Sequence, residues 1–118
     1  MVASAPSPLA IEVTADGDQG TVVLTGEIDL ATQANLRTVL TDLVVAGQIH
    51  LVVDLAGVSF IDSTGLGVLI GARRRVHALH GSVRLVNANA QVMRVFEITG
   101  LDRVFDISGV EAEASSTS

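Results

Sequence analysis

The segment from Ile49 to Leu55 restricts the fold more than any other part of this chain. It is almost entirely apolar, and a helical pattern begins shortly after it, inside the run Phe60 to Leu69. A short apolar run of this kind is typical of a parallel strand covered on both faces. A parallel strand followed closely by a helix is the unit of α/β folds. The sequence therefore predicts an α/β domain.

The remaining elements follow from periodicity and from turn residues. Apolar alternation predicts a half-buried strand near the start, and Asp16-Gly17-Asp18 predicts a hairpin turn to a second strand. Helices are indicated by 3.6-residue spacing and by glycines at their ends, with Gly47 ending the first helix and Gly81 the second. The expected strands lie at 9–14, 21–25, 49–55, 82–86 and 104–107, and the expected helices at 32–46, 63–80 and 89–99.

This order, β-β-α-β-α-β-α(-β), predicts a mixed β-sheet of about four to five strands packed with helices and joined by right-handed crossovers. Whether the helices cover one face or both stays open at this point. The 118 residues fit one domain, which we expect over 9–107. Residues 1–8 and 108–118 are expected to be a flexible arm and tail, because neither can bury enough apolar surface to offset the entropy of ordering.

Composition excludes several classes of function. The net charge of −6 argues against nucleic acid as a partner, since binding phosphates needs a basic face. No apolar run approaches the length of a membrane span, and no signal peptide is evident. The absence of cysteine excludes disulfides and Cys-ligated metals and suits a reducing compartment, so a cytoplasmic location is expected. All seven basic residues are Arg, which favours a GC-rich bacterial source.

Ser63 lies where the expected helix begins, and the N–H groups of a first helical turn lack partners in a locally positive field. A hydroxyl at such a place can carry a phosphate without disrupting the fold. A plainer interpretation is that Ser63 or Asp62 only caps the helix, which is worth about 1 kcal/mol. Gly65 and Gly67 each cost the helix about 1 kcal/mol. They favour close approach of a partner, although packing of Gly65 on its own sheet explains that glycine equally well.

Three motifs resemble those of the anti-sigma factor antagonists (anti-anti-sigma factors) of bacteria, which are built on the STAS domain. The most specific is the run from Asp62 to Gly67, Asp-Ser-Thr-Gly-Leu-Gly, at a fixed place between strand and helix. The others are the turn Gly26-Glu27-Ile28-Asp29 and the segment Ile98-Thr99-Gly100-Leu101. The resemblance extends from about Leu9 to Ile107.

The resemblance implies a phosphorylation switch. The unphosphorylated protein would bind an anti-sigma factor that is also a serine kinase, and the sigma factor would be released. The kinase, with its ATP and Mg²⁺, would phosphorylate Ser63, and a serine phosphatase would reverse this step. The protein itself would need no cofactor. Residues expected at the partner surface are Glu27, Asp29, Asp62, Thr64, Gly65, Gly67 and Val68.

Some of these assignments have alternatives in the sequence itself. Glu27 and Asp29 are equally well explained as solvated turn residues, and Val68 as a core residue. Thr64 is a second possible phosphate acceptor, ranked below Ser63 because the motif places the acceptor directly after the aspartate. A STAS scaffold with several partners and no dedicated sigma pathway is the alternative function.

An enzyme is disfavoured. Ser63 lacks the Gly-x-Ser-x-Gly frame of a nucleophile elbow, and nothing places a histidine beside it. Asp62-Ser63-Thr64-Gly65 has one residue too many for the aspartic-protease motif. His77 and His80 share a helix but lack further metal ligands, and no phosphate-binding P-loop is present.

Overall fold

The computed structural model describes residues 9–109, so the expected arm over 1–8 and residues 110–118 of the expected tail over 108–118 lie outside the described residues. Ser108, expected in the tail, is the last residue of the fifth strand. The elements occur in the predicted order, and a short 3₁₀ helix precedes the fifth strand. Their bounds are β1 Leu9–Asp16, β2 Gln19–Ile28, α1 Gln33–Val45, β3 His50–Ile61, α2 Ser63–Ala78, β4 Ser82–Val86, α3 Ala90–Thr99, η1 Leu101–Arg103 and β5 Asp106–Ser108.

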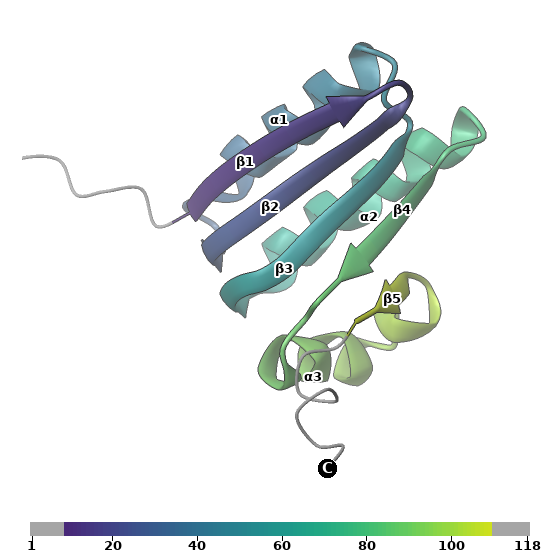
Figure 1. The fold of residues 1–118 in the computed structure, drawn as a ribbon. Helices are drawn as coiled ribbons and strands as arrows, with labels where there is room; N and C mark the ends of the chain where they lie inside the picture. Colours follow the sequence, from purple (N-terminus) through teal and green to yellow (C-terminus); the bar gives the residue numbers. More distant parts are fainter. Residues whose placement is uncertain (1–8, 110–118) are drawn as a thin grey trace, which may run out of the picture.

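One mixed sheet of five strands, in the order β1-β2-β3-β4-β5, forms the framework (Figure 1). β1 and β2 pair antiparallel through the predicted hairpin, with Asp16 opposite Gln19 and Gly17 at φ 62° in the two-residue turn. All the other neighbours pair parallel. The mixed α/β prediction is therefore confirmed.

The sequence left open whether the helices cover one face of the sheet or both. α1 and α2 lie side by side on one face of the sheet, and α3 lies at the end where β3 finishes (Figure 1). On β3 the inward side chains of Leu51, Val53 and Leu55 are at most 1% exposed, whereas Val52 and Asp54 are half-buried on the opposite face. The expectation that this strand is covered on both faces is therefore wrong.

The core is aliphatic, as the near absence of aromatic residues requires. On α2 the inward stripe is Leu66, Leu69, Ala72 and Val76, each no more than 5% exposed. The exception is an edge-to-face pair of Phe96 and Phe105, whose ring centroids are 6.0 Å apart and which joins α3 to the segment before β5. Within residues 9–109 no helix is long and apolar enough to cross a membrane.

The ends of the helices follow the sequence signals with one difference. Asn89 caps α3 by accepting from the N–H of Val92, and Gly100 follows that helix at φ 77°. At the end of α2, however, the left-handed residue is His80, at φ 65°, and not the predicted Gly81. Gly81 is required for a different reason, because a Cβ there would overlap the backbone carbonyl of Ile49, the residue just before β3.

This close approach predicts different effects for two glycines. Gly81→Ala should destabilise the domain by about 2 kcal/mol, because the chain must shift to relieve the overlap. Gly71→Ala, in the interior of α2 with open space around it, should instead stabilise by about 0.5–1 kcal/mol. Urea unfolding of both variants measures the difference. Equal effects would contradict this role of Gly81.

Candidate functional site

Ser63 is the first residue of α2, and Asp62 is its N-cap. The Asp62 backbone is extended (φ −113°, ψ −174°), and its Oδ1 accepts from the N–H groups of Thr64 at 2.9 Å and Gly65 at 3.1 Å. The cap is thus Asp62, and Ser63 is left exposed without a capping role. Among the described residues, the Ser63 hydroxyl has no hydrogen-bond partner.

The neighbouring hydroxyl of Thr64, unlike that of Ser63, is hydrogen-bonded within the domain. Thr64 is half-buried, and its Oγ1 donates to Asp62 Oδ1 at 2.5 Å. Transfer of a phosphate to this oxygen would require breaking a charge-assisted hydrogen bond that supports the cap. Ser63 requires no such step, so the geometry favours Ser63 over Thr64 as an acceptor.

Hydrogen bonds to the Asp62 carboxylate lower its pKa from the usual value of 3.8. The largest cause is the hydrogen bond from the Thr64 side chain, which outweighs the opposing effect of desolvation. Backbone N–H groups of Gly65, Thr64 and Leu30 lower the pKa further. Asp62, the residue next to Ser63, is therefore ionised at neutral pH.

The turn after β2 lies beside this cap, since the Asp62 N–H donates to the Ile28 carbonyl at 3.1 Å. The Asp29 side chain is hydrogen-bonded within the turn. Its Oδ1 accepts from the N–H of Ala31 at 3.0 Å and from the N–H of Thr32 at 3.1 Å. Glu27 is exposed. Of the two acidic residues of this turn that were predicted at the partner surface, Glu27 therefore has the more accessible side chain.

Thr32 is a structural residue of this turn that was not predicted from the sequence. It is only 2% exposed, and its Oγ1 donates to the Glu27 carbonyl at 2.8 Å while accepting from the Asp29 N–H at 3.0 Å. This reciprocal pairing of Asp29 and Thr32, three residues apart, has the pattern of a capping box, but it lies in the turn before α1, whose N-cap Thr32 makes no side-chain capping hydrogen bond. That spacing is the signal that would have identified it.

The two motif glycines have different surroundings. A Cβ on Gly65 would lie 2.5 Å from Ile28 Cγ2 and 3.0 Å from Ile61 Cγ1, so packing of α2 on its own sheet accounts for this glycine. Gly67 is exposed, and a Cβ added there would have nothing within 4 Å. Val68 is 4% exposed and belongs to the core, so it offers no surface to a partner and the core interpretation holds.

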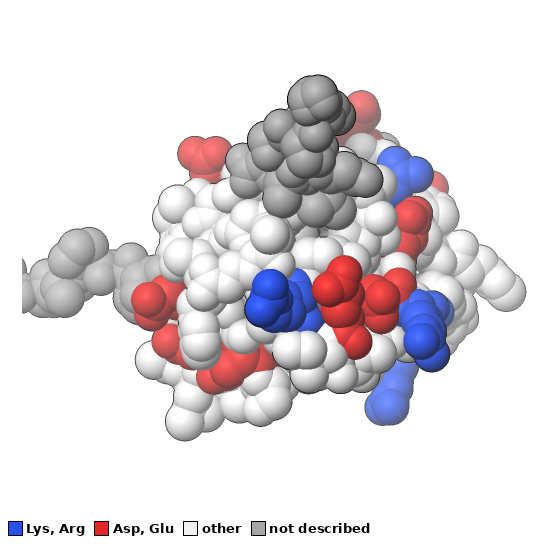
Figure 2. Space-filling view, turned by 90° about the horizontal axis from the view of Figure 1, so that it is seen from below, with Lys and Arg blue, Asp and Glu red and all other residues white. Residues whose placement is uncertain are grey.

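Two exposed apolar residues that the sequence motifs did not single out lie near Ser63. Leu30 is 72% exposed in the turn whose backbone bonds to Asp62, and Phe60 is 46% exposed opposite Glu27 in the β2–β3 register. Figure 2 views the domain from the end at which β3 finishes, and most of the surface visible there is uncharged, with acidic and basic groups next to one another near the centre of the view. Single apolar side chains at such a surface are possible anchors for a protein partner.

The chemistry available here is that of an exposed hydroxyl next to a carboxylate. His50 is at the opposite end of β3, and His77 is in the last turn of α2, so neither is placed as a base for Ser63. Within the described part of the chain, no three His, Cys, Asp or Glu side chains gather in a way that would hold a metal ion.

The lowered pKa of Asp62 predicts a pH dependence of stability. A carboxylate with a folded-state pKa below its unfolded value stabilises the fold above the unfolded pKa, and this contribution is lost as pH falls through the folded pKa. Asp62→Asn keeps a capping oxygen but removes the charge. The difference in unfolding free energy between the parent and Asp62→Asn should therefore be largest near neutral pH and shrink below about pH 4. A difference independent of pH would contradict the role of the charge.

Comparison with known proteins identifies the family to which this chain belongs. The family model of the STAS domain matches residues 10–114. The anti-sigma-B factor antagonist of Bacillus subtilis is 41% identical over 87 residues, covering 74% of this chain and 79% of that protein. The one from Listeria monocytogenes is 37% identical over 98 residues, covering 83% and 86%. The unphosphorylated form of the anti-sigma factor antagonist SpoIIAA superposes with a TM-score of 0.76 at 25% identity, covering 90% and 93%. The chain belongs to the STAS domain family of anti-sigma factor antagonists.

Proposed function

We propose that this protein is an anti-sigma factor antagonist whose binding to an anti-sigma factor is controlled by phosphorylation of Ser63. The names of its relatives support the first part of this proposal. The observation that carries the second part is the Ser63 hydroxyl, which is exposed at the first residue of α2 and has no internal hydrogen bond within the described residues. Binding the anti-sigma factor would leave the sigma factor free.

The modification requires a kinase, and we infer that the anti-sigma factor itself is that kinase. It would transfer the terminal phosphoryl group of ATP, with Mg²⁺, to Ser63 Oγ, and the hydroxyl proton would leave to a base of the kinase. A serine phosphatase would hydrolyse the phosphate ester and restore the binding form. SpoIIAA has been described in both an unphosphorylated and a phosphorylated form, which supports such a cycle.

The physical effect of the phosphate is local. It adds about −1.5 to −2 charges at neutral pH, next to the ionised Asp62 of a chain that already carries −6. The positive field at the start of α2 favours a negative charge there, so the domain should stay folded. A partner pressed against Ser63 would have to desolvate this charge. A penalty of about 3 kcal/mol is enough to weaken binding more than a hundredfold.

The site supports a protein that acts by binding and not by catalysis. Among residues 9–109 no base is placed beside Ser63, whereas exposed Leu30 and Phe60 and the open space at Gly67 suit contact with another protein. A regulator of transcription with these partners would work in the cytoplasm, and we assign the protein there as part of the same proposal.

The direct test uses three forms of the full chain and a candidate anti-sigma kinase. After incubation with ATP and Mg²⁺, mass spectrometry should locate one phosphate, on Ser63. Calorimetry should show that Ser63→Ala binds the kinase as tightly as the parent does, whereas Ser63→Asp binds at least about a hundredfold more weakly. The circular dichroism melting curves of both variants should match that of the parent.

Two results would contradict the switch. One is a phosphate on Thr64 with Ser63 unmodified. The other is equal binding by Ser63→Ala and Ser63→Asp, which would favour a scaffold that does not respond to phosphorylation.

A second prediction concerns the apolar neighbour of the site. Leu30→Ser should weaken binding to the anti-sigma factor by about tenfold or more, because it removes an exposed apolar contact beside Ser63. Val45→Ser is a matched control, since Val45 is 81% exposed at the other end of α1, far from the site. Both substitutions should change stability by less than about 0.5 kcal/mol. Equal affinities of the two variants would exclude Leu30 from the interface.

A further inference from the structure

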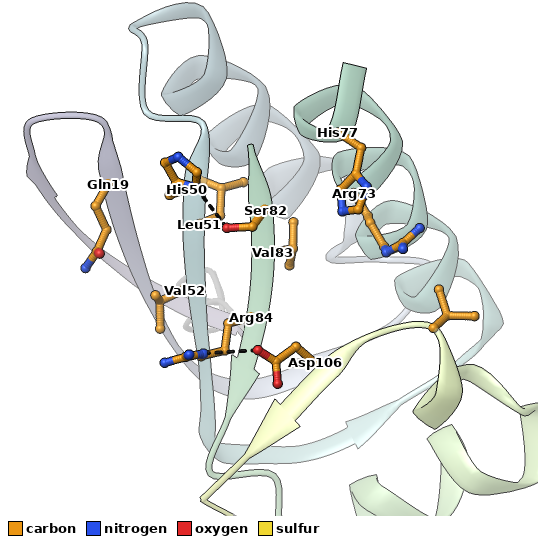
Figure 3. A pocket seen from close by; sticks show the side chains of 11 residues that line it. Gln19, His50, Leu51, Val52, Arg73, His77, Ser82, Val83, Arg84 and Asp106 are labelled. Carbon is orange, nitrogen blue, oxygen red and sulfur yellow. Dashed lines mark hydrogen bonds and ion pairs between the residues drawn. The ribbon is translucent and has the colours of Figure 1, made fainter. Parts of the chain in front are cut away.

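A hollow of about 450 Å³ lies along the edge of the sheet at β4, at the end of the domain away from Ser63. It exists because β5 has only three residues and begins with Asp106 opposite Arg84. The earlier residues of β4, Ser82 and Val83, therefore have no β5 residue beside them. The second half of α2 borders the same hollow (Figure 3).

Four of the eleven residues that line this hollow, His50, Arg73, His77 and Arg84, are cationic or cationisable. Arg73 and His77, four residues apart on α2, lie on the same side of β4 as Val83 (Figure 3). Arg84 and His50 lie on the other side of the strand. The two basic groups that share one side of the strand are therefore Arg73 and His77, in a chain with a net charge of −6.

Arg73 is the group that lacks a partner. It is half-buried and makes no hydrogen bond or ion pair with any described residue. The one acidic residue that lines the hollow is Asp106, and its Oδ2 already accepts from Arg84 Nε at 3.3 Å. Arg73 shares the lining of the hollow with the apolar residues Val83 and Val104.

We propose that this hollow is a binding site for a small organic phosphate. The guanidinium of Arg73 donates to phosphate oxygens in a fork, and a ring N–H of His77 adds a donor from the next turn of the helix. A tetrahedral phosphate accepts from several directions at once, which suits donors that come from two helical turns. Val83 and Val104 provide apolar contact for a compact organic group. This site is separate from Ser63, and the proposal does not depend on the proposed function.

The test is a titration of the full chain with phenyl phosphate, followed by amide NMR. We expect saturable shifts concentrated at residues 73–77 and 82–84, with the amide of Ser63 unchanged. Phenol and inorganic phosphate, which each carry one half of the probe, should bind more weakly than phenyl phosphate. Benzoate should also bind more weakly, because its planar carboxylate offers only two oxygens.

Variants of two adjacent arginines make the test specific. Arg73→Gln should weaken phenyl phosphate binding by about tenfold or more, and Arg73→Lys should retain part of the affinity. Arg74→Gln removes the same charge from the next residue, which is exposed and does not line the hollow, and should leave affinity unchanged. Melting curves check that each variant is folded.

Three outcomes would overturn the proposal. The first is shifts that do not saturate. The second is an equal loss of affinity in Arg73→Gln and Arg74→Gln, which indicates attraction by charge without a site. The third is equal or tighter binding of benzoate, which excludes phosphate as the preferred chemistry.

Discussion

Asp62 lies where three parts of the structure meet: the end of β3, the start of α2 and the turn after β2. Asp62 follows β3, and its carboxylate caps α2 through the N–H groups of Thr64 and Gly65. The backbone of Leu30, in the turn before α1, contributes to the lowered pKa of this carboxylate. The backbone of Asp62 also bonds to Ile28 at the end of β2. Because one side chain meets these demands, Ser63 is relieved of capping and its hydroxyl stays exposed. The site therefore depends on an interaction made by its neighbour.

Close packing beneath this cap holds the start of α2 in place. Gly65 lets the helix approach Ile28 and Ile61 more closely than any larger residue would allow, and Val68 and Leu69 are buried one turn later. A rigid helix start matters for a switch of the proposed kind, because the effect of a phosphate then falls on the partner and not on the fold. The exposed residues around it, which include Leu30 and Gly67, do not take part in this close packing.

Much of this fold could be predicted from local patterns. The hairpin is marked by Gly17, the strand β4 by its alternation, and the caps of α3 by Asn89 and Gly100, because each signal acts over a few residues. The errors arose where distant segments meet. Gly81 looked like a helix stop, yet it is required by the backbone of Ile49, just before a neighbouring strand. The apolar run of β3 suggested cover on both faces, although helices cover only one.

The sequence by itself determined the order of elements, the acidic and cysteine-free character, and the motif that places Ser63 after Asp62 at the start of a helix. These depend on composition and short-range spacing. Only the tertiary structure decided which motif residues are accessible: it placed Val68 in the core and Gly65 against the sheet, engaged Asp29 and Thr64 in hydrogen bonds, and left Ser63 exposed. It also placed Arg73 near the part of β4 that has no β5 residue beside it. The physical reason is that burial and pairing are set by contacts between segments far apart in the chain, which no local pattern records.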